Sequence, residues 1–175
     1  SIYTSYLLKY KYGMNPLTVT WAPHIYTDWG RKNMDSWIAS GVDNYLFTPN
    51  SKVHRLLTRI ALEEMFHPFQ PFIIGQKAFA PAFAAKLGIK LIFWGEAEAE
   101  DGNPIAEYNT PTQDWKYFAK NELDKVYLSG KSLTDLINKF GLSKEDLTPY
   151  LPVNPELLMD KEIDIRYMGY YERWH

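Results

Sequence analysis

Short apolar runs that alternate with helical patterns are the feature that most constrains the fold of this 175-residue chain. Four runs rich in β-branched, aromatic or aliphatic residues end at Gly, at Pro or in a polar stretch, which predicts strands at residues 17–22, 44–48, 72–75 and 91–94. Helical spacing predicts helices at residues 2–12, 33–40, 51–67 and 78–87. Continuous apolar strands separated by helices are typical of an α/β fold with a parallel sheet covered on both faces.

The length of the chain predicts one domain that spans residues 1–175. A hydrophobic fraction of 46% and an aromatic fraction of 16% argue against disorder. From about residue 105 the pattern is less regular. It predicts short helices that start at Ser132 and Ser143, and a last strand at residues 163–168.

Charge and composition exclude several classes of protein. The net charge is −2 and no basic stretch is long enough to follow a nucleic-acid backbone, so a DNA or RNA partner is not expected. The chain has no Cys, which excludes disulfides, thiolate nucleophiles and Cys-ligated zinc within these residues. No apolar run reaches the roughly 20 residues that span a bilayer, so a cytoplasmic protein without a membrane span is expected.

Polar residues follow each of the four predicted strands. In an open parallel sheet, ligands bind at the carboxyl ends of the strands, where loops and helix N-termini converge. The segments at these ends are Ala22-Pro23-His24 up to Asp28, Thr48-Pro49-Asn50-Ser51-Lys52, Gly75-Gln76-Lys77 and residues 95–103. The sequence therefore predicts one binding edge formed by these four segments.

The segment after the fourth strand is acidic. In an extended chain Glu96, Glu98 and Glu100 fall on one side at a period of two, which suits coordination of a divalent cation or a general base. The alternative is a solvated acidic loop, the more usual role of a charge run.

Basic residues and one His also have two interpretations. Lys52 and Arg55, with Arg59, share the polar face of a helix that starts near Asn50, and they either hold an anion at the helix start or form a solvated face. Lys77 either reaches a phosphate or carboxylate or is a plain exposed lysine. His24 pairs with Asp28 as acid and base or as metal ligands, or it is simply hydrogen-bonded.

Several strings of this sequence resemble the N-acetyl sugar amidotransferase family. These proteins are PP-loop ATPases of bacterial surface-polysaccharide, O-antigen lipopolysaccharide and flagellin-sugar pathways, including those of the pseudaminic acid type. The resemblance covers most of the chain and is most specific at residues 67–76 and 95–104. The matching strings are Thr20-Trp21-Ala22-Pro23-His24-Ile25-Tyr26-Thr27-Asp28, Asn44-Tyr45-Leu46-Phe47-Thr48-Pro49-Asn50, residues 52–59, His67-Pro68-Phe69-Gln70-Pro71-Phe72-Ile73-Ile74-Gly75-Gln76, and Gly95-Glu96 through Gly102-Asn103-Pro104.

The resemblance implies a three-layer, Rossmann-like sandwich with a parallel sheet, truncated here at both ends. Family members carry an S-G-G-x-D-S phosphate loop at the end of their first strand, and Ser1 corresponds to the last residue of that loop. A Cys-rich segment is expected upstream and a further region after His175. The 175 residues alone are therefore not expected to turn over. Ala97 departs from the family pattern, which has Asn between the first two glutamates.

The activity that the resemblance implies is ATP-dependent. The oxygen of a sugar N-acetyl group attacks the α-phosphorus of ATP with Mg²⁺ present, and ammonia then displaces AMP to leave an acetamidino group. The implied partners are a nucleotide-linked or free N-acetyl sugar and a glutaminase subunit that supplies ammonia, because this chain has no thiol to hydrolyse glutamine. The implied site residues are Ser1 at phosphate, Trp21, Ala22 and Pro23 near adenine, Gly75, Gln76 and Lys77 near phosphate or substrate, Glu96 and Glu98 at Mg²⁺ or in proton transfer, and His24, Asn50, Lys52, Arg55 and Asn103 at the sugar.

Two other functions fit the same residues. One is a different PP-loop ATP pyrophosphatase or ligase, although the lack of a basic surface counts against an RNA substrate. The other is a subunit that binds a nucleotide or a sugar without catalysis.

Overall fold

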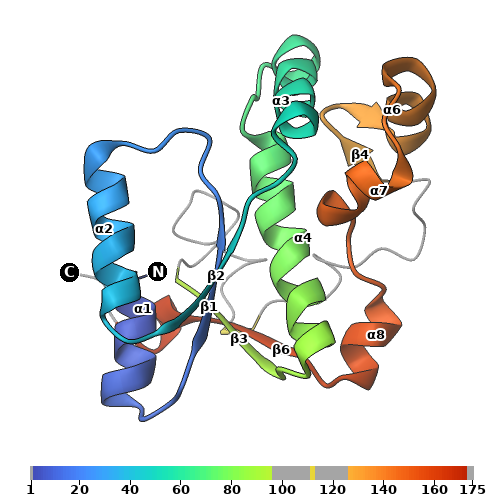
Figure 1. Ribbon diagram of the computed structural model, residues 1–175. Coiled ribbons are helices and arrows are strands. Elements are labelled where there is room, and N and C mark those ends of the chain that lie inside the picture. Colours follow the sequence, from blue (N-terminus) through green and yellow to red (C-terminus); the bar gives the residue numbers. More distant parts are fainter. Residues whose placement is uncertain (1, 96–110, 113–125, 173–175) are drawn as a thin grey trace. The chain divides into compact units, whose positions relative to one another are not determined.

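Helices, two parallel strand pairs and one antiparallel pair form the regular structure in the described part of the chain, which is residues 2–95, 111–112 and 126–172 of the computed structural model (Figure 1). The mixed α/β class predicted from the sequence is confirmed. The chain divides into two compact units. The first unit comprises Ser1–Phe47, Leu91–Asp114 and Asp164–His175, and the second comprises Thr48–Lys90 and Trp115–Ile163.

The first parallel pair of the first unit joins β1 (Leu17–Trp21) to β2 (Asp43–Phe47). The helix α2 (Asp28–Ala39) lies between them in sequence, as the crossover that a parallel pair requires. Polar side chains also link the strands: Thr18 Oγ1 donates to the Asp43 carbonyl at 2.7 Å, and Asn44 Nδ2 donates to Thr18 Oγ1 at 2.9 Å. The predicted strands at residues 17–22 and 44–48 are confirmed to within one residue.

The start of α2 differs from the prediction. The sequence predicts a helix capped by Asn33, but the structure begins it at Asp28, with Thr27 as the N-cap. The Thr27 side chain accepts a hydrogen bond from the Gly30 backbone N–H at 3.0 Å, and Asp28 places a negative charge in the first turn. These two contributions offset the cost of a glycine in the first turn of the helix.

The second parallel pair joins β3 (Leu91–Trp94) to β6 (Asp164–Tyr167). Both strands were predicted, at residues 91–94 and 163–168. The pairing differs from the predicted continuous sheet, because within the described residues β1–β2 and β3–β6 are separate two-stranded sheets.

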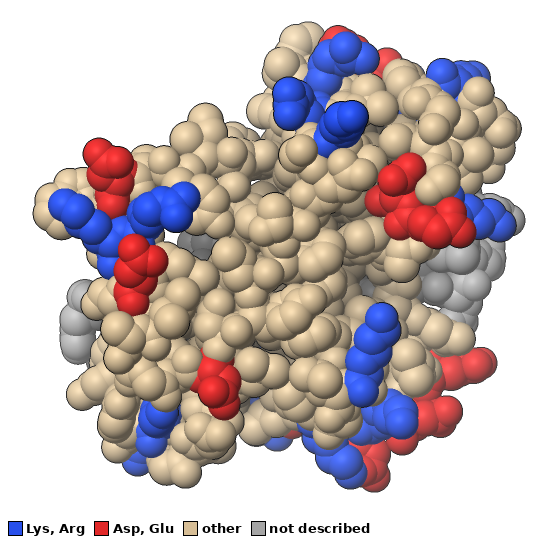
Figure 2. Space-filling model, viewed as in Figure 1, with Lys and Arg blue, Asp and Glu red and all other residues tan. Residues whose placement is uncertain are grey.

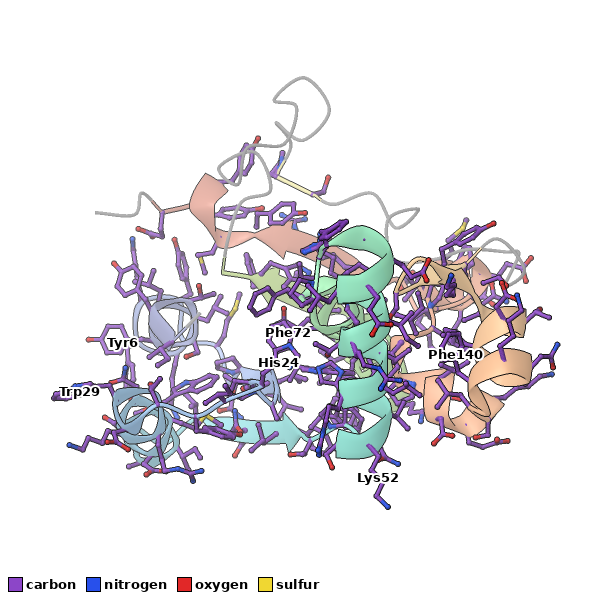
Figure 3. The ribbon with its side chains drawn as sticks, turned by 90° about the horizontal axis from the view of Figure 1, so that it is seen from above. Tyr6, His24, Trp29, Lys52, Phe72 and Phe140 are labelled. Atoms are coloured by element: carbon purple, nitrogen blue, oxygen red, sulfur yellow. The ribbon has the colours of Figure 1, made fainter. Side chains whose placement is uncertain are left out.

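A helical layer accompanies the first strand pair. The helix α1 (Ile2–Tyr6) continues into η1 (Leu7–Lys11), one turn of π-helix, so the predicted helix at residues 2–12 is confirmed. Trp37 of α2 donates its indole N–H to the buried Ser5 hydroxyl at 3.0 Å. Gly13, at a φ of 66°, follows in the left-handed conformation that ends a helix. Figures 1 and 3 show α1 and α2 on the same side of β1.

The core of the second unit forms around α3 (Ser51–Met65) and α4 (Gln70–Leu87). The apolar face of α3 is closed to solvent, as its spacing predicts: Leu57, Ile60 and Ala61 are at most 1% exposed. The sequence offers Asn50 or Ser51 as the cap of α3, and the structure shows Asn50, whose side chain accepts from the Lys52 N–H at 3.1 Å.

A buried polar pair joins α3 to η5 (Thr148–Tyr150), a 3₁₀ turn. His54 Nδ1 lies 2.8 Å from the Tyr150 hydroxyl, and the two rings are stacked with centroids 5.8 Å apart. Burial raises the pKa of Tyr150 well above its ordinary value, so the phenol stays protonated and can donate to the imidazole.

The helix α4 corrects the strand predicted at residues 72–75. Residues 70–87 form one continuous helix of 18 residues, with Pro71 in its first turn and Gly75 in its interior. A short apolar run does not by itself distinguish a buried strand from a buried helix. The helix is favoured by Pro71, whose fixed φ suits the first helical turn and which has no N–H to leave unsatisfied there.

A hairpin packs against the ends of these two helices. The strands β4 (Tyr127–Leu128) and β5 (Lys131–Ser132) are antiparallel, and both turn residues, Ser129 and Gly130, have positive φ. The Ser129 N–H donates to the side-chain oxygen of Gln70 at 2.8 Å. This contact anchors the hairpin on the first turn of α4.

Short capped helices complete the second unit. Ser132 caps α6 (Leu133–Phe140), which ends at Gly141, and Ser143 forms a capping box at α7 (Lys144–Leu147), as the sequence predicts. The helix α8 (Pro155–Asp160) follows. It packs in a small apolar cluster whose members are Val153, Leu158, Ala82 and Ile163.

Candidate functional site

The carboxyl end of the β1–β2 pair is the best-defined candidate site in the first unit. Trp21 and Phe47 lie opposite each other at the last pair of the register, and their ring centroids are 4.9 Å apart. The Ala22 N–H extends the ladder by one hydrogen bond, to the Phe47 carbonyl at 2.8 Å. This bond fixes the backbone direction at the point where β1 leaves the sheet.

Burial changes abruptly at this end of β1. Trp21 is 4% exposed and Ala22 is 7% exposed, whereas Pro23 and His24 are exposed. A ligand at this edge would therefore contact a rigid, buried backbone on one side and exposed side chains on the other. Partial burial of the ring lowers the pKa of His24 below its ordinary value, so the imidazole is neutral at pH 7 and has one acceptor nitrogen.

This edge is poor in backbone donors. The Ala22 N–H is already bonded to the Phe47 carbonyl, and Pro23 has no N–H. A ligand that approaches these two residues would find no free backbone N–H there and could bond only to their carbonyl groups. That pattern suits a ligand with an amino group.

The predicted site residues divide between the two units. Trp21, Ala22, Pro23, His24 and Asp28 belong to the first unit, and the remaining described ones belong to the second. Ser1, Glu96, Glu98, Glu100 and Asn103 lie outside the described residues. The members in the second unit are Asn50, Lys52, Arg55, Gly75, Gln76 and Lys77.

The three predicted residues on α4 are not at the end of a strand. Gly75 is buried inside the helix, and Gln76 and Lys77 are half-buried on it. The predicted turn at Gly75 is therefore wrong, because the apolar run before it is helical. A role for Gln76 or Lys77 has to be argued from a helix face instead of from a loop.

The basic face of α3 has the arrangement that the sequence predicts. Lys52, Arg55 and Arg59 are all exposed, while the residues between them include buried Val53 and His54. Figure 2 shows basic side chains gathered over α3, and Figure 3 shows Lys52 extending away from the helix. All three side chains would be exposed both in a site that holds an anion and on a solvated helix face. The geometry is therefore consistent with both interpretations.

A cluster of aromatic and basic residues was not predicted from the sequence. The Arg31 guanidinium lies 4.6 Å from the centre of the Tyr26 ring, and the Lys32 ammonium lies 4.7 Å from the centre of the Trp29 ring. Both cations lie within the energetically useful range for a cation–π contact. The contact between Lys32 and Trp29 could have been predicted, because residues at positions i and i+3 of a helix lie on the same face.

Metal and membrane features are limited in the described ranges. There, no group of three or more His, Asp or Glu side chains is placed to hold a metal ion. Glu96 and Glu98, the predicted Mg²⁺ ligands, lie outside those ranges. None of the helices in residues 2–95, 111–112 and 126–172 is both long enough and apolar enough to cross a membrane.

Comparison of the chain with protein-family models and with curated proteins finds no match.

Proposed function

We propose that the carboxyl end of the β1–β2 pair binds the adenine of ATP, as part of an enzyme that converts the N-acetyl group of a sugar to an acetamidino group. The observation that carries the proposal is the parallel pairing of β1 with β2, which ends at Trp21 and Phe47 with one further hydrogen bond from Ala22, just before Pro23. Ligands of open parallel sheets bind at such ends. The resemblance to N-acetyl sugar amidotransferases supplies the nucleotide and the reaction.

The proposal includes the fold of a PP-loop ATPase. A PP-loop ATPase has one parallel sheet between two layers of helices, whereas the described residues form two parallel pairs in the first unit. The resemblance implies a further strand that carries the phosphate loop. Such a strand, paired with both β1 and β3, would join the two pairs into one sheet.

The chemistry follows from the poor reactivity of an amide. An amide oxygen is a poor leaving group. When it attacks the α-phosphorus of ATP, pyrophosphate leaves and the oxygen becomes part of an AMP group, and ammonia that adds to the same carbon then expels AMP together with this oxygen. In this proposal Glu96 and Glu98 would hold Mg²⁺, because carboxylate oxygens suit that ion, and the ion would supply positive charge next to the departing pyrophosphate. The residues of the β1–β2 edge hold the base and contribute no atom to the bonds that change.

Nucleotide binding is the direct test of the adenine site. The Ala22–Pro23 edge offers carbonyl acceptors, so we expect ATP to bind more tightly than ITP, which carries a carbonyl where adenine has its amino group. Loss of one hydrogen bond and exposure of an unpaired acceptor predicts a difference of about tenfold in Kd. Isothermal titration calorimetry with both nucleotides in the presence of Mg²⁺ measures it.

A variant at Ala22 links this binding to the proposed edge. Ala22→Val adds volume at a position that is 7% exposed, and we expect weaker ATP binding with the chain still folded. Lys144→Gln, an exposed change in α7, is the matched control and should bind ATP like the unaltered protein. Equal binding of ATP and ITP, or ATP binding that Ala22→Val leaves unchanged, would contradict the proposal.

A further inference from the structure

The solvent-facing side of α3 changes in charge along the helix. At 3.6 residues per turn, five exposed residues of α3 fall within an arc of about 100°, on the side opposite buried Val53, Leu57 and Ile60, and the exposed C-cap follows them. In chain order, this outer face consists of Lys52, Arg55, Arg59, Leu62, Glu63 and Phe66. Its first half is therefore basic, and its second half is apolar with one acidic residue.

The apolar residues of the outer face are open to solvent. Leu62 is 49% exposed, and Phe66 is 89% exposed. In Figure 3 none of the other described elements is drawn over α3. Large apolar side chains that are exposed next to charged ones are typical of the centre of a protein–protein interface, where aromatic residues and arginine are enriched.

The charged residues at the middle of the outer face pair only loosely with each other. Arg59 Nε lies 3.8 Å from Glu63 Oε1, and the two side chains are 65% and 62% exposed. An ion pair this open to water is weak. Both groups can therefore exchange this contact for one with another molecule.

The charge order of the outer face makes it complementary to itself when two copies of α3 run in opposite directions. With a two-fold axis at the level of Ala61, Arg59 of each copy lies at the level of Glu63 of the other copy. Leu62 then lies next to Leu62 of the second copy, close to the axis. Such an arrangement forms two ion pairs around an apolar centre.

The ends of the outer face also fit in this orientation. Arg55 of one copy comes to the level of Phe66 of the other copy, where a cation–π contact can form. The Arg55 residues of the two copies are about 18 Å apart along the helices at a rise of 1.5 Å per residue, which is more than the Debye length at physiological salt. Parallel helices would instead place each basic residue beside its own copy.

We propose that the outer face of α3 is a dimer interface, and that it binds the outer face of a second copy of this chain in antiparallel orientation. A partner with charge of one sign would match only the basic half of the face or only Glu63. A second copy matches both parts at once. The interaction also buries Leu62 and Phe66, which are exposed in the single chain.

The dimer should be weak and reversible, because one helix face per copy is a small interface. We expect a Kd of about 10 to 100 μM for the unaltered chain. Sedimentation velocity at concentrations from about 1 to 500 μM, a range that brackets this Kd, measures it. A monomer at every concentration would overturn the inference.

Charge reversal tests whether the two copies meet through Arg59 and Glu63. Arg59→Glu and Glu63→Arg each place like charges opposite each other in a dimer, so each variant alone should dimerise at least about tenfold more weakly. A mixture of the two variants restores opposite charges at both contacts, and a heterodimer with nearly the original Kd should form. The double variant Arg59→Glu/Glu63→Arg should dimerise like the unaltered chain for the same reason.

A matched control separates this effect from a general change in charge. Lys139→Glu on α6 makes the same charge change and also removes an ion pair between residues i and i+4, that of Lys139 with Asp135, but it should leave the dimer intact. Full dimerisation of Arg59→Glu, an equal loss in Lys139→Glu, or no association in the mixture would overturn the inference.

A second pair of variants tests the apolar centre. Leu62→Ser should weaken the dimer about tenfold, because the side chain lies next to the two-fold axis. Leu157→Ser on α8 removes an apolar side chain of similar exposure, 40% against 49%, and should have no effect on the dimer. Equal dimerisation of these two variants would contradict the placement of Leu62 at the interface.

Discussion

Phe66 combines two features that are unusual for a large apolar residue. It is the C-cap of α3 with a φ of 54°, in the left-handed region, and it is 89% exposed. Its N–H bonds to the Leu62 carbonyl at 3.1 Å, in the pattern that usually has glycine at this position. The backbone conformation is thus set by the end of the helix and is unfavourable for the side chain that it carries.

Phe66→Gly should therefore stabilise the protein. Glycine removes the steric cost of the left-handed conformation. This gain exceeds the cost of the greater chain entropy that glycine has in the unfolded state, so we expect the free energy of unfolding to rise by about 0.5 to 1 kcal/mol. Phe66→Ala keeps the β-carbon and should give no such gain. Urea denaturation of both variants measures the difference, and a gain from Ala equal to that from Gly would contradict this account.

Glu172 is the acidic centre of a small network in the first unit. It pairs with Lys11 and accepts a hydrogen bond from the Tyr12 hydroxyl at 2.6 Å. The hydrogen bond from Lys11, followed by that from Tyr12, lowers the pKa of Glu172 below its ordinary 4.5. This carboxylate thus ties the end of the N-terminal helical segment to the residues after β6.

The pH dependence of stability follows from the direction of that shift. A lowered pKa in the folded state stabilises the protein fully above pH 4.5, and the contribution is lost as the pH falls through the lowered value. Glu172→Gln should lower the urea midpoint at pH 7 and have a smaller effect at pH 3. Glu156→Gln, at an exposed position in α8, is the control; a loss in Glu172→Gln that is the same at both pH values would exclude this linkage.

The turn of the β4–β5 hairpin requires glycine at position 130 for two reasons. Gly130 has a φ of 76°, and a β-carbon there would lie 2.9 Å from Met65 Cγ and 3.2 Å from Glu64 Cβ. The turn thus needs glycine both for its backbone conformation and for its close approach to α3. Gly141, at a φ of 70°, needs it for conformation alone, because a β-carbon there would meet nothing within 4 Å.

The comparison of these two glycines isolates the packing contribution. Gly141→Ala should lower the free energy of unfolding by about 1 kcal/mol, and Gly130→Ala by about 1 kcal/mol more, because Met65 must move. Met65→Ala in the Gly130→Ala background should recover part of the additional loss. Equal losses at the two glycines in urea denaturation would rule out the close approach.

The elements that were predicted best from the sequence are helices that have a capping residue at the start or a glycine at the end. Asn50, Ser132 and Ser143 cap helices as predicted, and Gly13 and Gly141 end them. The patterns failed at residues 72–75, where an apolar run fits a buried helix as well as a buried strand. They also placed the start of α2 too late. Gly30 is unfavourable in a helix and so argued against a helical turn at this point, whereas the structure has a first turn here that Thr27 and Asp28 stabilise.

At the scale of the whole molecule, pairing partners were harder to predict than elements. The strand that became β6 was predicted from its alternating pattern, but nothing in residues 91–94 identifies residues 164–167 as their partner. The same limit applies to the candidate site. The end of β1 was predicted from its own residues, whereas the contacts of Arg31 and Lys32 with aromatic rings depend on where α2 begins.

The pairing of β3 with β6 has a consequence for how the protein is made. Leu91 lies opposite Asp164, and the intervening chain includes every residue of the second unit from Trp115 to Ile163. During synthesis on the ribosome, β3 leaves the exit tunnel long before its partner has been translated. The first unit therefore reaches its final form only after the whole of the second unit has been synthesised, and the edge of β3 stays unpaired and open to aggregation and to chaperones until then.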